Sequence, residues 1–171
     1  MIRTLFLLLI AAAAVASRLI PHPVNFAPVA ALALFGGAYF DRRISFLLPF
    51  AVLLVSDFFL GFYTGIAWVY GSFFLVSLIG WRLRERRTLG RTAAATLAGS
   101  VLFFVVTNFG VWLGGALYTP DLAGLAACYA AAIPFFRNTL AGDGFYVAVL
   151  FGIAELAARR IPALGLQGPS R

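Results

Sequence analysis

The chain has 171 residues, 63% of them hydrophobic and 16% aromatic, and its mean hydropathy is +0.97. Soluble domains are about 45–50% apolar, so an excess spread along the whole chain requires lipid as the surrounding solvent. The net charge is +7, and every basic residue is an arginine near the end of an apolar run. This placement indicates membrane topology rather than nucleic-acid binding. We therefore predict one integral membrane domain over residues 1–171, with the lipid bilayer as a partner and no nucleic acid.

Residues that hold metals or carry common catalytic motifs are scarce. One histidine and one cysteine cannot by themselves form a zinc site or an internal disulfide. The chain contains no P-loop, no GxGxxG, no GxSxG and no HExxH. We expect no catalytic residues, no metal and no cofactor. Because the P-loop is absent, any transport driven by ATP needs a separate ATPase subunit.

Six apolar runs are candidates for membrane-spanning helices. A span needs about 20 mostly apolar residues. The predicted spans are residues 4–20, 26–40, 44–62, 65–81, 92–118 and 138–158. The first two are short and need flanking residues to cross the bilayer. The predicted fold is all-α, a polytopic membrane helix bundle with six transmembrane helices.

A seventh apolar run, Leu122–Phe136, is short. With six spans and a cytoplasmic N-terminus, every arginine except Arg18 and Arg137 lies on the cytoplasmic side, as the positive-inside rule favours. A seventh span would move the C-terminal arginines outside and weaken this bias. We therefore predict that Leu122–Phe136 is a re-entrant or interfacial segment in the last external loop, and that both termini are cytoplasmic.

The N-terminal run has two interpretations. Arg3, an apolar stretch and the tripeptide Ala14-Val15-Ala16 fit a secretory signal peptide over residues 1–16, whose removal would leave five spans. If the run is retained, Ala12 and Ala16 form a small-xxx-small pair that allows another helix to approach closely. That pair serves either packing within the bundle or contact with a partner helix.

Polar side chains gather at the external end of the predicted bundle. Polar residues within spans are energetically unfavourable and tend to mark function. The predicted substrate-binding residues are Arg18, His22, Asn25, Asp57, Asn108, Arg137, Asn138 and Asp143. Because the cytoplasmic half is nearly apolar, we expect a cup that opens outward and is closed below.

Each of these residues also has a structural interpretation. Asp57 and Asp143 suit helix caps or ion pairs with Arg137 and Arg18, and Asn108 suits an interhelical hydrogen bond. In the functional interpretation, arginines hold a carboxylate or phosphate of the ligand. The loop RLIPHPVNFAP, stiffened by its prolines, then holds His22 and Asn25 over the cup as a lid.

Four segments are long and distinctive enough to carry a family resemblance: RLIPHPVNFAPVAALALFGGAYF, LLVSDFFLGF, FFVVTNFGVWL and CYAAAIPFFRNTLAGDGFY. They resemble a family of uncharacterised bacterial inner-membrane proteins (DUF6580), which carries no established activity. In size, span count and polar external half, that family is similar to the substrate-binding S components of energy-coupling factor (ECF) transporters.

This second resemblance implies a function. It implies a membrane-embedded component in the bacterial inner membrane that binds a vitamin-like molecule or metal complex for uptake. The partners would be ECF transmembrane and ATPase subunits, and Ala12 and Ala16 would contact the transmembrane subunit. Cobalamin-transporting S components use a cysteine as a cobalt ligand, but Cys128 does not align with it, so that role is not transferred. The alternative is a non-transporting scaffold subunit or a small integral-membrane enzyme.

Overall fold

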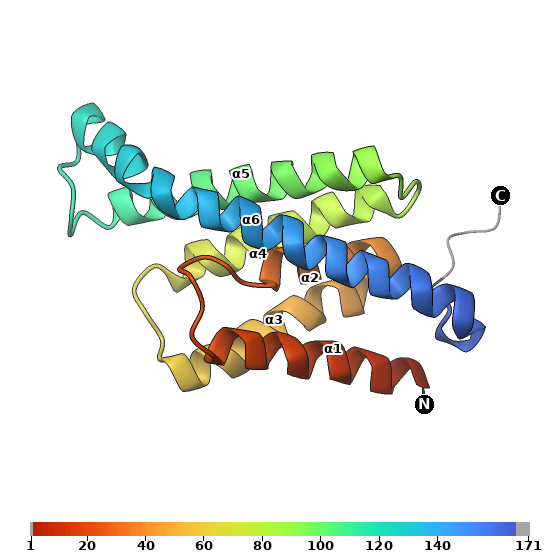
Figure 1. Ribbon diagram of the computed structural model, residues 1–171. Helices are drawn as coiled ribbons and strands as arrows, with labels where there is room; N and C mark the ends of the chain where they lie inside the picture. Colours follow the sequence, from red (N-terminus) through yellow and green to blue (C-terminus); the bar gives the residue numbers. More distant parts are fainter. Residues whose placement is uncertain (1, 167–171) are drawn as a thin grey trace.

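The computed structural model describes residues 2–166 as six α-helices and one short 3₁₀ helix, with no strand among these residues (Figure 1). The elements are α1 (Ile2–Leu19), α2 (Val29–Tyr39), α3 (Arg42–Leu60), α4 (Ile66–Leu83), α5 (Leu89–Leu113), α6 (Leu122–Arg160) and η1 (Pro162–Leu164). The predicted all-α class is confirmed. Five helices, all but α2, are long and apolar enough to cross a membrane, so the chain forms a helical membrane bundle.

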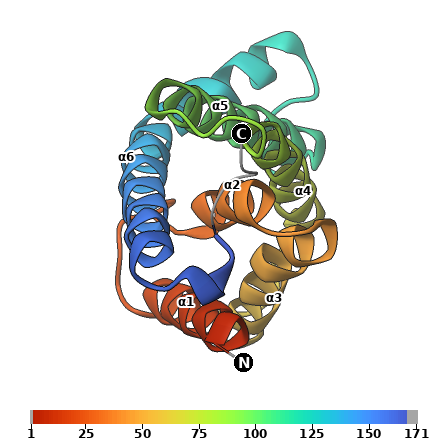
Figure 2. The ribbon, with the colours of Figure 1, turned by 90° about the vertical axis from the view of Figure 1, so that its right-hand side faces the viewer.

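The short helix α2 lies at the centre of the bundle. Figure 2, an end view, shows α1, α3, α4, α5 and α6 arranged as a ring around it. All 11 residues of α2 are buried. A helix that is apolar on every side is stable only when other helices or lipid surround it, and here the five long helices provide that environment.

The predicted count of six full spans is not confirmed, because α2 is too short. Its 11 residues extend about 16 Å, roughly half of the hydrocarbon core. The helix begins only after Pro28, since three prolines at positions 21, 23 and 28 interrupt regular hydrogen bonding in the preceding segment. Residues 20–28 therefore connect the end of α1 to a helix start near the middle of the bundle.

Two glycines bring α2 and α4 into backbone contact. A Cβ atom built on Gly37 would lie 2.7 Å from backbone atoms of Ser77 and Gly80. A Cβ on Gly80 would lie 2.6 Å from the carbonyl oxygen of Leu34. Small residues allow such close approach, and this contact anchors the central helix to the ring.

The prediction of a separate re-entrant segment at Leu122–Phe136 is wrong. These residues form the first part of α6, which continues without a break for 39 residues to Arg160. Asp121 caps the helix by accepting a hydrogen bond from the Gly124 amide at 2.7 Å. The alanine-rich sequence favours helix, and Pro134 removes only one backbone donor, so the helix bends in its first half rather than ending (Figure 1).

The two ends of the bundle differ in charge. The start of α1 and the end of α6 lie at one end, together with the α2–α3 and α4–α5 connections; we call this the terminal end (Figure 1). The distal end carries residues 20–28, 61–65 and 114–121. All described arginines except Arg18 and Arg137 lie at the terminal end, and Arg171 lies outside the described residues.

Candidate functional site

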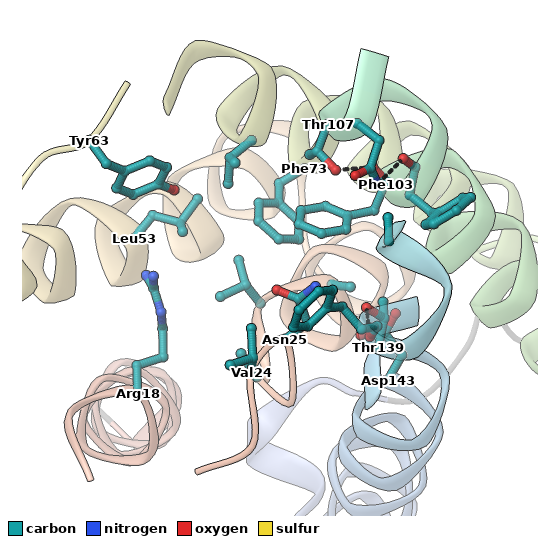
Figure 3. Close-up of a pocket in the computed structure, with 18 of the residues that line it drawn as sticks. Arg18, Val24, Asn25, Leu53, Tyr63, Phe73, Phe103, Thr107, Thr139 and Asp143 are labelled. Atoms are coloured by element: carbon teal, nitrogen blue, oxygen red, sulfur yellow. Dashed lines mark hydrogen bonds between the residues drawn. The ribbon is translucent and has the colours of Figure 1, made fainter. Parts of the chain in front are cut away.

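A cavity of about 470 Å³ lies in the distal half of the bundle, beyond the start of α2 (Figure 3). All six α-helices and the 20–28 segment contribute to its lining. Val29 and Ala30, in the first turn of α2, form its floor, and the exposed residues His22 and Val24 lie at its edge. We call this space the distal cavity. It exists because α2 occupies only the other half of the ring.

Five of the eight predicted substrate-binding residues line the distal cavity: Arg18, His22, Asn25, Asn108 and Asp143. The other three do not line it. Asp57 is buried behind Arg18, Arg137 is exposed on α6, and Asn138 is half-buried beside it. The structure thus brings together residues from the first connection and from α1, α5 and α6.

Arg18 and Asp57 form a nearly buried ion pair. Arg18 Nη2 donates to Asp57 Oδ1 at 2.8 Å, and the two side chains are 13% and 1% exposed. The second carboxylate oxygen accepts a hydrogen bond from the Tyr70 hydroxyl at 3.1 Å. Arg18 also donates to the Ser56 hydroxyl. Asp57 therefore has the structural role of neutralising Arg18, and this network ties α1, α3 and α4 together.

Asp143 has no such cation. Asp143 is 3% exposed, and its Oδ2 accepts a hydrogen bond from the Ser100 hydroxyl at 2.6 Å. Among residues 2–166, the one ion pair within 4.0 Å is that of Arg18 and Asp57, so no basic nitrogen faces Asp143 at that distance. A carboxyl group at this depth with a single neutral partner is energetically unfavourable, and Asp143 stays a predicted binding residue.

Aromatic rings form much of the cavity wall. Phe73 of α4 and Phe103 of α5 stack with ring centroids 5.1 Å apart and an interplanar angle of 28°. Phe104 and Phe135 extend this wall toward α6. Tyr63, in the α3–α4 connection, lies across the cavity. Burial, followed by the negative charge of Asp57, raises the pKa of Tyr63, so its hydroxyl remains neutral and able to donate.

The 20–28 segment forms one wall of the cavity. Asn25 adopts φ of 65°, a left-handed conformation that asparagine tolerates better than most residues. The Phe26 amide donates to the Pro23 carbonyl at 3.0 Å, which closes a turn. Phe26 then packs against the rings of Phe145 and Tyr146 at 5.8 and 5.5 Å. The segment is thus anchored to α6, while its predicted movement as a lid stays a prediction.

A second hollow of about 600 Å³ lies between α5 and α6 in the terminal half. We call it the terminal groove. It is lined mainly by apolar residues, but the Tyr39 hydroxyl donates to Glu155 Oε1 at 2.9 Å and the Arg87 guanidinium lies 4.3 Å above the Tyr39 ring. Ser100 lines this groove and Asp143 lines the distal cavity, so their hydrogen bond forms the wall between the two spaces.

Several residues of the site were not identified from sequence. Phe73 and Phe103 of the distal cavity and Ser100 of the terminal groove resemble the many other phenyl and hydroxyl groups of the spans, and nothing in the sequence distinguishes them. Only the depth of Asp143 in its span indicates that some partner is needed. Cys128 is 2% exposed and its thiol contacts the Asn108 carbonyl at 3.4 Å, away from the cavity lining.

Ala12 and Ala16 lie on the exposed side of α1, whereas Ala14 faces the bundle and is buried. The same exposed side carries Leu5 and Leu9. The pair is therefore not used for packing within this chain, and the surface it forms is available to lipid or to another helix.

Comparison with known families agrees with the resemblance carried by the four sequence segments. The model of a family of unknown function (DUF6580) matches residues 1–164, and the chain belongs to that family. No curated protein and no solved structure matches the chain. The similarity to ECF S components stays a prediction.

Proposed function

We propose that this protein is a membrane-embedded substrate-binding component for the uptake of a small, vitamin-like organic molecule, and that the distal cavity is its binding site. The observation that carries the proposal is the cavity itself. Its volume of about 470 Å³ is in the range of ligand pockets, and it combines aromatic walls with a few convergent polar groups.

The arginine distribution supports an orientation for this site. Cytoplasmic segments of membrane proteins are enriched in arginine, so we place the terminal end and both chain termini in the cytoplasm. The distal cavity then faces the exterior of the bacterial inner membrane. The buried helix α2 closes the cytoplasmic half, as expected for a protein that captures a substrate from outside.

ATP-driven transport would require partners, because the chain has no nucleotide-binding motif. We propose transmembrane and ATPase subunits of the ECF type. The exposed side of α1 supports this, since Ala12 and Ala16 leave a shallow surface flanked by leucines on which a partner helix can pack closely.

Ligand capture by matched valine variants of α5 tests the proposed site. Val111 lines the distal cavity and is 44% exposed, whereas Val101 on the same helix is 42% exposed and lies outside the cavity lining. Purified wild-type protein and the Val111→Trp and Val101→Trp variants are incubated with a metabolite extract, and retained molecules are identified by mass spectrometry. We expect wild type and Val101→Trp to retain the same molecule and Val111→Trp to lose it.

Equal retention by both variants would place the binding site elsewhere. Retention of nothing by wild type, combined with turnover of a lipid, would favour a small integral-membrane enzyme. No retention and no turnover would favour a scaffold subunit.

A further inference from the structure

The charged groups of the distal cavity are not balanced. Arg18 lines the cavity, but its charge is neutralised by Asp57 at 2.8 Å. Asp143 also lines the cavity, and within residues 2–166 its one hydrogen-bond partner is the Ser100 hydroxyl. The positive end of the α2 dipole faces the same space, but it contributes only about half a charge. The described side chains therefore leave Asp143 without a counter-charge in the cavity.

Three neutral polar side chains of the cavity, Thr107, Thr139 and Asn108, direct donors to the backbone of their own helices. The hydroxyls of Thr107 and Thr139 donate to the backbone carbonyls of Phe103 and Phe135, at 2.7 and 3.2 Å. The Asn108 amide nitrogen donates to the Phe104 carbonyl at 2.8 Å. Because the two hydroxyl hydrogens and one of the two Asn108 amide hydrogens are already used, these three side chains can offer oxygen lone pairs to a ligand.

The aromatic part of the lining also favours a positively charged ligand. The faces of aromatic rings carry partial negative charge and attract cations, most strongly where water is excluded. Phe73, Phe103 and Phe104 line the cavity on the side of α4 and α5, and Asp143 lines it from α6. A ligand positioned between them meets rings on one side and a carboxylate on the other.

We infer that the ligand of the distal cavity is an organic cation, an ammonium or N-alkylated heteroaromatic group on an apolar framework, whose charge is neutralised by Asp143. This inference rests on the proposed function of the cavity as a binding site. It reverses the expectation that arginines hold an anionic ligand, because Arg18 is already paired and Arg137 lies outside the cavity lining.

Three probes that share a benzyl group test the inference: benzyltrimethylammonium, neutral N-benzylacetamide and anionic benzylphosphonate. Their dissociation constants are measured by isothermal titration calorimetry on the full chain in lipid nanodiscs. We expect wild type to bind the cation at least about tenfold more tightly than the other two probes. Asp143→Asn keeps the side-chain shape and should abolish this preference.

Two further variants keep the test valid if Asp143→Asn does not fold. Phe103→Leu should weaken cation binding about threefold or more and leave binding of the neutral probe unchanged. Glu85→Gln makes the same kind of charge change at an exposed position between α4 and α5, and should leave all three affinities at wild-type values.

The outcomes separate this inference from the proposed function. If the neutral or anionic probe binds as tightly as the cation and loses affinity in Val111→Trp, the cavity is a binding site but the inferred charge is wrong. If cation binding survives in both Asp143→Asn and Phe103→Leu, the inference is also overturned. If no probe binds to wild type, the inference fails and the proposed function loses support.

Discussion

The two halves of this bundle share the same ring of five long helices but differ in what fills the centre. In the terminal half, the apolar helix α2 fills the ring and contacts α4 through glycine backbones. In the distal half, the chain between α1 and α2 runs along the wall and leaves a cavity of about 470 Å³. The comparison teaches that a single half-length helix is enough to divide the centre of one bundle into a packed half and a half that holds a cavity.

The largest effect should come from the ion pair that borders the distal cavity. Asp57→Ala leaves the Arg18 guanidinium largely buried without a counter-charge, and we expect a loss of about 3 kcal/mol in unfolding free energy. Denaturant unfolding in detergent, followed by circular dichroism, measures it. The double variant Arg18→Met with Asp57→Leu removes both charges and should regain most of this loss. A single variant as stable as wild type would show that the pair does not hold the distal half together.

In the terminal half, the corresponding destabilising substitution is Gly80→Ala. The new methyl group would meet the Leu34 backbone at 2.6 Å, so α2 and α4 must separate, and we expect a loss of about 2 kcal/mol. Gly71 is the matched control on the same helix, because nothing lies within 4 Å of a Cβ at that position. Gly71→Ala should be neutral or slightly stabilising in the same unfolding experiment. Equal effects of the two substitutions would contradict the close contact of α2 and α4.

A smaller difference in stability is expected between the Tyr→Phe variants of two tyrosines, one in each half. Tyr39→Phe removes a hydrogen bond of a buried residue to Glu155 in the terminal groove, and should lower stability by about 1 kcal/mol. Tyr129→Phe removes a solvent-exposed bond from a half-buried residue to the Val105 carbonyl near the distal end, and should change stability by at most about 0.5 kcal/mol. Unfolding curves of the two variants measure the contrast, and the reverse order would show that the central helix is not held through Tyr39.

The smallest effect on stability is expected on the outside of α1. Ala16→Leu adds volume where the side chain is exposed, so the free energy of unfolding should change by less than about 0.5 kcal/mol. The same substitution should prevent co-purification of a membrane partner if this surface binds one. Leu9→Ala, on the same exposed side of the helix, makes the surface shallower and serves as the comparison. Unchanged co-purification with Ala16→Leu would remove this surface from the proposal.

Much of the fold is predictable from the sequence because lipid imposes a simple rule on span length. The predicted spans 44–62 and 65–81 agree closely with α3 and α4, and the charge asymmetry follows directly from the arginines. The role of α2 is not predictable in this way. A run such as VAALALFGGAY is equally suited to lipid and to the centre of a bundle, and hydropathy cannot distinguish the two.

The continuity of α6 and the composition of the site were harder to predict. The short apolar run Leu122–Phe136 and the arginine count predicted a separate segment, but helical hydrogen bonding on both sides of Pro134 maintains a single helix. The pairing of Arg18 with Asp57 was among the structural interpretations of the sequence, whereas the contact of Ser100 with Asp143 joins residues 43 positions apart. Pairs this distant in sequence depend on how the helices are arranged, which no local pattern specifies.

The uninterrupted helix α6 also provides a physical link across the bilayer. It carries Asp143 at the wall of the distal cavity and Glu155, bonded to Tyr39, in the terminal groove. These two residues are separated by about 18 Å along one helix. Any tilt of α6 at its distal part moves Glu155 relative to α2. Under the proposed function, occupancy of the distal cavity would therefore be sensed in the terminal groove through the part of α6 between Asp143 and Glu155.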